Sequence, residues 1–392
     1  MQTGRLVRGS ARLAVDAVDG VTGIVEGMYR NIAALSPPLG AEPSGPARGI
    51  AGLVHAAIRS GTRETGRALD ALLASLERPL DELAPPGPAR EAAVSAINGV
   101  LGDHLEASGN PLAIEMAFRR EGIELRSDAS ELAETLACAG PVLLITLHGL
   151  CMSDRQWRHR GHDHAEQLAT TQRMSRIDLR YNSGRHVSDN GSDFAHRLQA
   201  LVEAWPVPPR SITLLCHSMG GLVARSAIAM AEAEGLAWRR SLRAVAFLGT
   251  PHRGAPLERG GDALNRLALH SPYTAPLARL GWIRSAGITD LRHGSISRDD
   301  WNGRDRFREP LCARRLPPPA GVRCLCVAAS LGPVTAAAPR SDGLVPVASA
   351  LGLPVADDQQ LLRHRRNHWQ LLSDPVVSDF LADRLGTAMP AA

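Results

Sequence analysis

Residues 211–222 read Ser-Ile-Thr-Leu-Leu-Cys-His-Ser-Met-Gly-Gly-Leu. An apolar run typical of a buried strand ends at Ser218, and an apolar helix pattern follows from Leu222 to Met230. The turn matches the Gly-x-Ser-x-Gly nucleophile elbow except at its first position, which is Cys216. Small residues beside the serine allow the close backbone approach that such a turn needs. The stretch therefore predicts a strand–turn–helix unit that presents Ser218 as a nucleophile.

An acid and a base are expected later in the chain, in that order. A strand pattern over residues 322–329 is followed by a loop that contains Asp342, and His368 precedes an amphipathic C-terminal segment. A serine hydroxyl is a poor nucleophile unless an imidazole takes its proton, and a carboxylate must hold that imidazole in the right tautomer. We therefore expect Ser218, His368 and Asp342 to act together as a catalytic triad.

Each of these assignments has a competitor. Asp342 is followed by glycine, and Asp-Gly is also an ordinary solvated turn. His364 competes with His368, but arginines surround it, which is typical of an exposed turn, whereas His368 is followed by leucines. His217, adjacent to the serine, is expected to face away and to serve packing or hydrogen bonding.

Hydrolysis also requires donors for the oxyanion, and these are normally backbone N–H groups. One is expected from Met219, directly after the nucleophile. The other is expected after the strand pattern of residues 141–147, where His148 and Gly149 let the backbone turn so that the N–H of Leu150, or alternatively of Cys151, points into the site.

Taken together, these segments resemble the lipase and esterase branch of the α/β-hydrolase superfamily. The most specific one is Gly-Thr-Pro-His-Arg-Gly at residues 249–254, which is similar to a segment of bacterial triacylglycerol lipases and inositol-deacylase-like hydrolases. The resemblance covers residues 112–392 and implies a mostly parallel central sheet flanked by helices, and a serine ester hydrolase that needs no cofactor. Two positions depart from the family pattern, Cys216 and Ala255.

Several further residues are expected to line the substrate site. Polar side chains lie in the loop after the strand pattern of residues 176–181. They would either contact a polar or anionic part of the substrate or hold the loop in place. The residues assigned to substrate binding are His148, Gly149, Cys151, Arg180, Asn182, Arg185 and His252. The cluster of His159, His162, Asp163 and His164 is interpreted as a helix start capped by Asp163, and no metal site is expected.

Composition excludes several other classes. The formal charge is +4, the chain has no lysine, and its arginines are spread along the sequence, so no nucleic-acid surface is expected. The six cysteines show no repeated spacing and are interpreted as small core residues. Neither a signal peptide nor a membrane span is recognised, which predicts a cytoplasmic location.

The domain organisation expected is a helical segment over residues 1–108 and a catalytic domain over residues 109–392, which opens with a hairpin around Gly122. An insertion at about residues 255–320 is interpreted as a lid lined by leucines. Residues 1–108 carry apolar seams on long helices. These helices either dock on the catalytic domain or lie on a membrane or lipid-particle surface. In the second case, arginines near residue 8 would contribute positive charge to binding at that surface.

The sequence thus predicts a serine carboxylic-ester hydrolase that acts on lipid-like acyl esters through an acyl-enzyme intermediate. A thioesterase or acyltransferase would use the same triad and remains an alternative. A non-catalytic lipid-binding or scaffold protein on a hydrolase fold is the alternative from another class. The acyl-chain length, the alcohol part of the substrate and the oligomeric state are left open.

Overall fold

The computed structural model describes residues 3–33, 49–75, 87–125, 132, 139–255, 285–304, 316–334 and 340–386. These residues form two compact units. The first contains two long helices, α1 and α2, and both ends of helix α4. The second contains the middle of α4, residues 95–102, and all the strands. The bounds of these helices are α1 (Thr3–Ala33), α2 (Gly49–Ser75) and α4 (Pro88–Ala107), of which α4 is shared between the two units.

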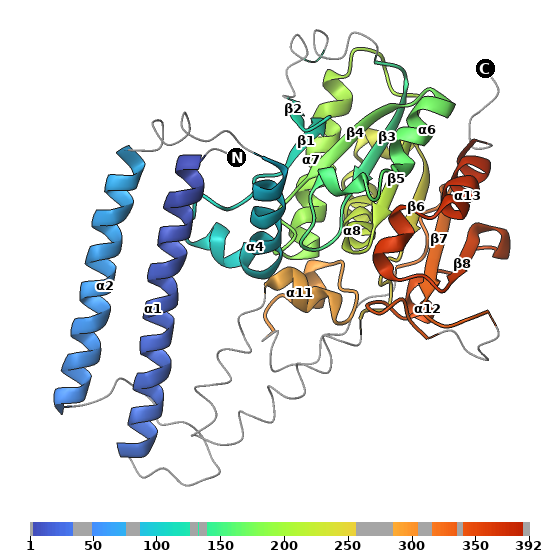
Figure 1. Ribbon diagram of the computed structural model, residues 1–392. Helices are drawn as coiled ribbons and strands as arrows, with labels where there is room; N and C mark the ends of the chain where they lie inside the picture. Colours follow the sequence, from blue (N-terminus) through green and yellow to red (C-terminus); the bar gives the residue numbers. More distant parts are fainter. Residues whose placement is uncertain are drawn as a thin grey trace. The chain divides into compact units, whose positions relative to one another are not determined.

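The second unit is built on one eight-stranded sheet in the order β2-β1-β4-β3-β5-β6-β7-β8 (Figure 1). β1 runs antiparallel to both β2 and β4, and the pairs from β4 to β8 are all parallel. The mostly parallel sheet and the opening hairpin around Gly122 are confirmed. The strands are β1 (Ala117–Arg120), β2 (Ile123–Leu125), β3 (Val142–Leu147), β4 (Ser175–Arg180), β5 (Ser211–His217), β6 (Leu242–Leu248), β7 (Arg323–Ser330) and β8 (Gln360–His364).

Helices cover both faces of this sheet, which explains why the central strands are apolar at nearly every position. On one face, α7 and α8 pack on side chains such as Ile145 and Leu214. On the other face, α6 and α13 pack on Leu144 and Leu215. The α-helices of this unit are α6 (His164–Gln172), α7 (Val187–Ala204), α8 (Met219–Glu234), α11 (Ala286–Leu291), α12 (Val347–Ala350) and α13 (Pro375–Gly386).

Short 3-10 turns join several of these elements. They are η1 (Asp154–Trp157), η2 (Ala237–Ser241), η3 (Arg298–Asp300), η4 (Asp357–Gln359) and η5 (His368–Leu372). Asp163 caps the start of α6 by accepting from the N–H groups of Ala165 and Glu166, so the predicted helix start is confirmed. Asn367 and Gln370 form a capping box at η5, which fixes the backbone on either side of His368.

The first unit joins α1 to α2 through both packing and charge. Gly66 in α2 leaves room for Val15, whose nearest methyl would lie 2.8 Å from a Cβ added at that glycine. Arg8 and Arg12 of α1 both bond the carboxylate of Asp70 in α2. Part of the apolar seam stays exposed, at Val7, Val18, Val21, Leu69 and Leu72. No helix of the described residues is long and apolar enough to cross a membrane.

Only part of the expected lid lies within the described residues. Residues 285–304 contain α11 and η3, and residues 316–322 lead into β7, whereas residues 256–284 and 305–315 lie outside the description. The described part packs on the loop after β4. Asp290 accepts from the N–H of Val187, and the rings of Trp301 and His186 stack with their centroids 3.7 Å apart. Whether the insertion acts as a lid stays a prediction.

Candidate active site

Ser218 stands at the sharp turn between β5 and α8. Its φ is 54° and its ψ is −123°, a backbone conformation that L-residues rarely adopt and that is typical of strained functional turns. Its N–H donates to the carbonyl oxygen of Leu248 at 2.8 Å, which ties the turn to the end of β6. The side chain is half-buried, while His217 and Met219 on either side are buried. The turn therefore exposes the serine more than its neighbours.

The glycines around the turn are needed for close approach. A Cβ added to Gly220 would collide with the carbonyl oxygens of Leu147 and His148. A Cβ added to Gly149 would lie 3.1 Å from the Cβ of Ser218 and 3.1 Å from Nδ1 of His217. The backbone after β3 thus runs directly beside the serine, as the predicted oxyanion loop requires.

His368 and Asp342 form a buried pair. Nδ1 of His368 lies 2.6 Å from Oδ2 of Asp342, and Asp342 is only 2% exposed, so it does not sit in a solvated turn. The other carboxylate oxygen accepts from the N–H groups of Leu344 and Val345, at 2.9 and 2.8 Å. The N–H of His368 also donates to the carbonyl oxygen of Asp342 at 3.2 Å. These contacts fix the carboxylate so that it holds one nitrogen of the ring.

The serine and the histidine lie at the same edge of the sheet. Ser218 follows β5 and His368 follows β8, and parallel strands bring their carboxyl ends to one edge. The ring of His217 lies 4.7 Å from that of His368, and a Cβ added to Gly249, beside Leu248, would lie 2.8 Å from Cε1 of His368. The described residues contain no hydrogen bond between Ser218 and His368.

His217 has the supporting role expected of it. It is fully buried, and its Nε2 lies 3.4 Å from the carbonyl oxygen of His368, to which it donates. Burial, together with the nearby His368, holds the pKa of His217 well below its usual range. A neutral ring at this position supports the backbone of His368 without adding charge to the site.

The proposed oxyanion donors differ in their availability. The N–H of Cys151 donates to Oγ of Ser183 at 3.1 Å, so this group is already engaged. Within the described ranges, no hydrogen bond takes the N–H of Leu150 or of Met219. Of the two alternatives on this loop, the geometry therefore favours Leu150. The contact from Ser183 gave no sequence signal, because it joins two loops 32 residues apart.

His148 is a fully buried part of the loop. Its ring stacks on Tyr181 with centroids 4.2 Å apart, and the hydroxyl of Tyr181 donates to its carbonyl oxygen at 2.7 Å. Nδ1 lies 2.9 Å from the carbonyl oxygen of Gly149, and Nε2 accepts from the N–H of Tyr181 at 3.4 Å. Burial lowers the pKa of His148 to about 4. These contacts assign His148 to holding the turn at Gly149.

The other residues expected at the substrate loop are largely engaged in structure. Asn182 is buried, donates to the carbonyl oxygen of Gly102 in α4, and accepts from the N–H of Gly184. Arg185 pairs with Asp193 of α7. Arg180 ends β4 with its side chain mostly buried. These side chains were expected either to contact substrate or to hold the loop in place, and the contacts favour the second role.

His252 lies at the end of the Gly-Thr-Pro-His segment and is buried against Phe247, with ring centroids 4.8 Å apart. Its Nδ1 lies 3.4 Å from Nη1 of Arg225, and its Nε2 has no partner among the described residues. Burial and the adjacent Arg225 hold its pKa well below its usual range. The sequence gave no signal for this contact, since Arg225 belongs to an otherwise apolar helix.

His162, His164 and Cys216 have structural surroundings. His162 and His164 both contact Oγ of Ser378, and the described residues contain no group of three or more potential metal ligands. Cys216 is completely buried, and burial raises the pKa of its thiol well above the usual value. It therefore occupies the first elbow position as a small, unreactive core residue.

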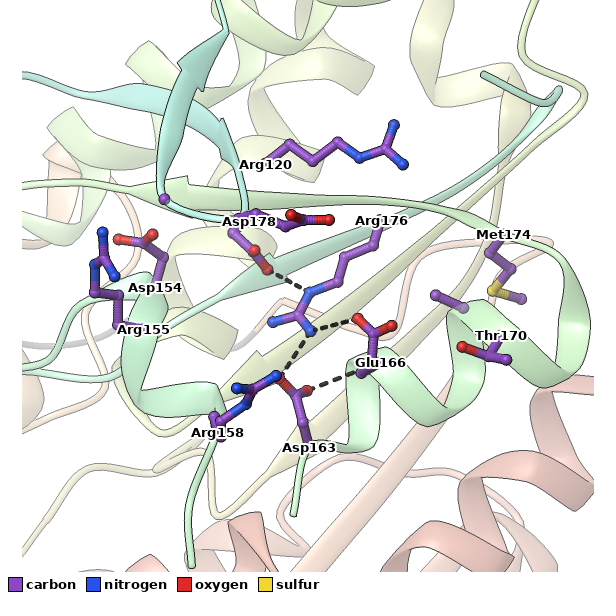
Figure 2. Close-up of a pocket in the computed structure, with 13 residues that line it drawn as sticks. Arg120, Asp154, Arg155, Arg158, Asp163, Glu166, Thr170, Met174, Arg176 and Asp178 are labelled. Atoms are coloured by element: carbon purple, nitrogen blue, oxygen red, sulfur yellow. Dashed lines mark hydrogen bonds and ion pairs between the residues drawn. The ribbon is translucent and has the colours of Figure 1, made fainter. Parts of the chain in front are cut away.

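A polar cavity of about 560 Å³ lies away from this site (Figure 2). Ser218 is not part of its lining, in which four arginines face five carboxylates. Figure 2 shows the central ion pairs, in which Arg176 bonds Asp163, Glu166 and Asp178. Because the carboxylates outnumber the arginines by one, the lining has no excess of positive charge for an anion. The ion pairs of Arg176 join the start of α6 to β4.

The comparisons agree with this architecture. Residues 138–310 match the model of the family described as PGAP1-like alpha/beta domain, a span that contains the elbow and the segment Gly-Thr-Pro-His. The matched span covers less than half of the 392 residues of the chain. The match supports the resemblance to hydrolase-type α/β domains, and the mostly parallel sheet flanked by helices confirms the expected fold class. No curated protein sequence matches the chain.

Solved structures similar to this chain include lipase BlEst2 of Bacillus licheniformis in its mature form. It is 19% identical, with a TM-score of 0.42 and coverage of 62% of this chain and 91% of that one. The thioesterase RedJ of Streptomyces coelicolor is 19% identical, with a TM-score of 0.35 and coverage of 64% and 92%. An esterase of Pyrobaculum calidifontis is 14% identical, with a TM-score of 0.36 and coverage of 63% and 75%. At these values the likenesses carry no argument about activity.

Proposed function

We propose that this protein is a serine carboxylic-ester hydrolase that acts on lipid-like acyl esters. The observation that supports it best is the joint placement of Ser218 and of the buried His368–Asp342 pair. The serine is the more exposed residue of a strained turn at the carboxyl edge of a parallel sheet, and the pair follows β7 and β8 at the same edge. Ligands of open α/β sheets bind at this edge.

The reaction follows from the roles that the geometry allows. Oγ of Ser218 attacks the ester carbonyl while Nε2 of His368 takes its proton, because Nδ1 is held by Asp342. The oxyanion accepts from the N–H groups of Leu150 and Met219. His368 then protonates the leaving alcohol and activates the water that hydrolyses the acyl-enzyme, which releases the acid and restores Ser218. The hydrogen bond from serine to histidine forms when substrate binds, since such bonds are often loose in free enzymes.

The preference for lipid-like esters is supported by two observations. The Gly-Thr-Pro-His segment lies directly after β6, next to the serine turn, as in the lipase-like resemblance. The helical unit exposes valines of α1 and leucines of α2, which are suited to contact with a membrane or lipid-particle surface. Peripheral lipid association is thus part of the proposal.

Labelling with a fluorophosphonate probe, read out by intact mass, tests the activated serine. We expect one covalent adduct on the wild-type protein and none on Ser218→Ala. The matched control is Ser192→Ala, which changes a partly buried serine of α7 away from the site and should label like the wild type. Absence of an adduct on folded wild-type protein, with and without detergent, would instead favour the non-catalytic scaffold.

A substrate series then distinguishes the chemical alternatives. We expect p-nitrophenyl esters to be hydrolysed with a preference for medium or long acyl chains over acetate. The matching acyl thioesters and an added acceptor alcohol test thioesterase and acyltransferase activity with the same triad. Turnover of thioesters alone, or transfer in preference to hydrolysis, would contradict the assignment to ester hydrolysis while leaving Ser218 as the nucleophile.

A further inference from the structure

A second cavity, of about 640 Å³, lies along α8 and away from the serine. Its lining combines the later half of α8 with residues 296–298 and 316–320, and Ser218 is not part of it. The lining residues of α8 begin at Arg225, seven positions after Ser218, so the cavity starts roughly 10 Å farther along the helix axis. Its walls are mostly apolar and include Ile228, Met230, Ile296 and Leu316. The volume is in the usual range for small-molecule sites.

Arg225 brings to this cavity a positive charge that no carboxylate within the described ranges balances. The side chain is only 6% exposed. Its Nη2 donates to the carbonyl oxygen of Leu316 at 2.6 Å and its Nη1 to Nδ1 of His252 at 3.4 Å. No carboxylate of the described residues forms an ion pair with it. A buried charge is costly unless it is paired, so a cation in this position calls for an anionic partner.

The neighbouring charges do not supply that partner. Glu232 also lines the cavity, but it pairs with Arg239, and Arg298 pairs with Asp189 of α7. Burial lowers the pKa of Arg225 to about 10, which still leaves it protonated near neutral pH. His252 is neutral there, because its pKa lies well below the usual range. Among the residues that the structure describes, one net positive charge therefore remains beside an apolar cavity.

We propose that this cavity binds a long-chain carboxylate, with the carboxylate at the guanidinium of Arg225 and the alkyl chain along Ile228, Met230 and Leu316. An amphiphile with one negative charge matches both Arg225, which has no carboxylate partner in the described part of the chain, and the apolar walls. A guanidinium presents several N–H donors in one plane, which suits a carboxylate. The site is separate from the serine, so the proposal does not depend on the proposed hydrolase activity.

Titration calorimetry of the full-length Ser218→Ala variant with dodecanoate tests the site in the absence of turnover. We expect one equivalent to bind, with an affinity at least tenfold higher than that of dodecanol or dodecyltrimethylammonium, which have the same chain without the negative charge. Shorter carboxylates should lose about fourfold in affinity per CH₂ removed. Equal binding of dodecanoate and dodecanol would overturn the proposal in favour of a nonspecific apolar site.

Two variants locate the ligand. Arg225→Met keeps much of the side-chain volume and should lower dodecanoate affinity at least tenfold while leaving dodecanol binding unchanged. Ala229→Trp, at a half-buried lining position, should weaken binding of both by filling the cavity. Arg243→Met changes an exposed arginine outside the cavity and should have no effect.

Separate controls check the folding of the variants and the location of the bound ligand. Far-ultraviolet circular dichroism and thermal melts select the variants that fold, and Ala229→Trp tests the same cavity if Arg225→Met does not fold. Dodecanoate binding that survives both folded variants would overturn the proposal. So would loss of the binding when wild-type protein is blocked at Ser218 with a phosphonate, because the ligand would then occupy the active site.

Discussion

Asp342 Oδ2 lies 2.6 Å from His368 Nδ1, and the other oxygen of the same carboxylate accepts two backbone N–H groups. Both residues are buried, and of their side-chain atoms alone 1% is exposed in Asp342 and 4% in His368. The loop of Asp342 therefore binds one carboxylate oxygen through its backbone N–H groups, and the other oxygen contacts the imidazole. In the proposed mechanism, this arrangement selects the tautomer of His368 that leaves Nε2 free to take a proton.

Replacing Asp342 with asparagine tests that relationship. The amide keeps the shape of the side chain but stabilises the wrong tautomer and cannot support the charged imidazolium, so kcat should fall by about 10⁴. Thermal stability should change much less than activity. The matched control is Asp163→Asn, which alters the cap of α6 and should lower Tm while preserving kcat. Ester hydrolysis by Asp342→Asn within tenfold of wild type would show that Asp342 is not the acid.

Gly149→Ala tests the close approach of the loop to the nucleophile. The added methyl would lie 3.0 Å from Sδ of Met152 and 3.1 Å from the Cβ of Ser218, so the loop or the serine must shift. A displacement of this kind at the oxyanion loop should lower kcat by roughly 10- to 100-fold with a smaller change in KM. Steady-state kinetics on a p-nitrophenyl ester measures the effect.

Its control is Gly61→Ala in α2, where nothing lies within 4 Å of the added methyl. Alanine is the better helix former by about 1 kcal/mol, so this variant should be slightly more stable and equally active. If Gly149→Ala kept wild-type kcat, Leu150 would not be an oxyanion donor in the manner proposed.

Buried neutral histidines should make the sheet unit sensitive to acid. Burial lowers the pKa of His148 and of His164 to about 4, and those of His217 and His252 fall well below the usual range. Between pH 6.5 and 4 the unfolded chain binds protons that the folded chain does not, so stability falls as pH falls. Each histidine contributes about 1 kcal/mol of loss per pH unit in that window.

Urea unfolding of the Ser218→Ala variant at pH 7.5, 6.0 and 5.0 measures how the free energy of unfolding changes with pH. His164→Gln, which removes one of the buried rings, should have lower stability at pH 7.5 and a shallower dependence on pH. His104→Gln, which removes a half-exposed ring of α4, is the control and should leave the slope unchanged. A stability that is constant from pH 7.5 to 5.0 would contradict the prediction.

The stability of the packing between α1 and α2 should depend on pH through the carboxylate of Asp70. Its hydrogen bonds from Arg8 and Arg12 hold its pKa well below the usual range. A lowered carboxylate pKa adds stability above the unfolded pKa of about 4, and this stability is lost as pH falls below it. The carboxylate is partly exposed, so the contribution of each pair is about 1 kcal/mol or less.

Hydrogen exchange of the full-length protein, resolved by peptide, measures this effect. Asp70→Asn should speed exchange in α1 and α2 near neutral pH and leave β3 and β5 unchanged. Asp103→Asn, at a half-buried position near the carboxyl end of α4, is the matched control. Unchanged exchange in α1 and α2 of the Asp70 variant would show that packing alone joins the two helices.

Local patterns predicted much of the fold because they depend on near neighbours in the chain. The apolar run that ends at Ser218 and the helix pattern after it became β5 and α8, and the alternation around Gly122 became a hairpin. The order of serine, acid and histidine selected Asp342 and His368, which the structure brings within hydrogen-bonding distance. The pairing of the three as a triad in catalysis stays a prediction.

The tertiary structure alone decided which polar groups are engaged. The sequence predicted the N–H of Leu150 as the donor with Cys151 as the alternative, and the contact of Cys151 with Ser183, 32 residues away, now separates them. Asn182 was as plausible for substrate as for structure until its amide was placed against α4. Arg225 lies in an apolar helix and gave no sign of facing a cavity. Periodicity determines which elements form, whereas burial and the choice of partner depend on distant segments that meet only when the chain folds.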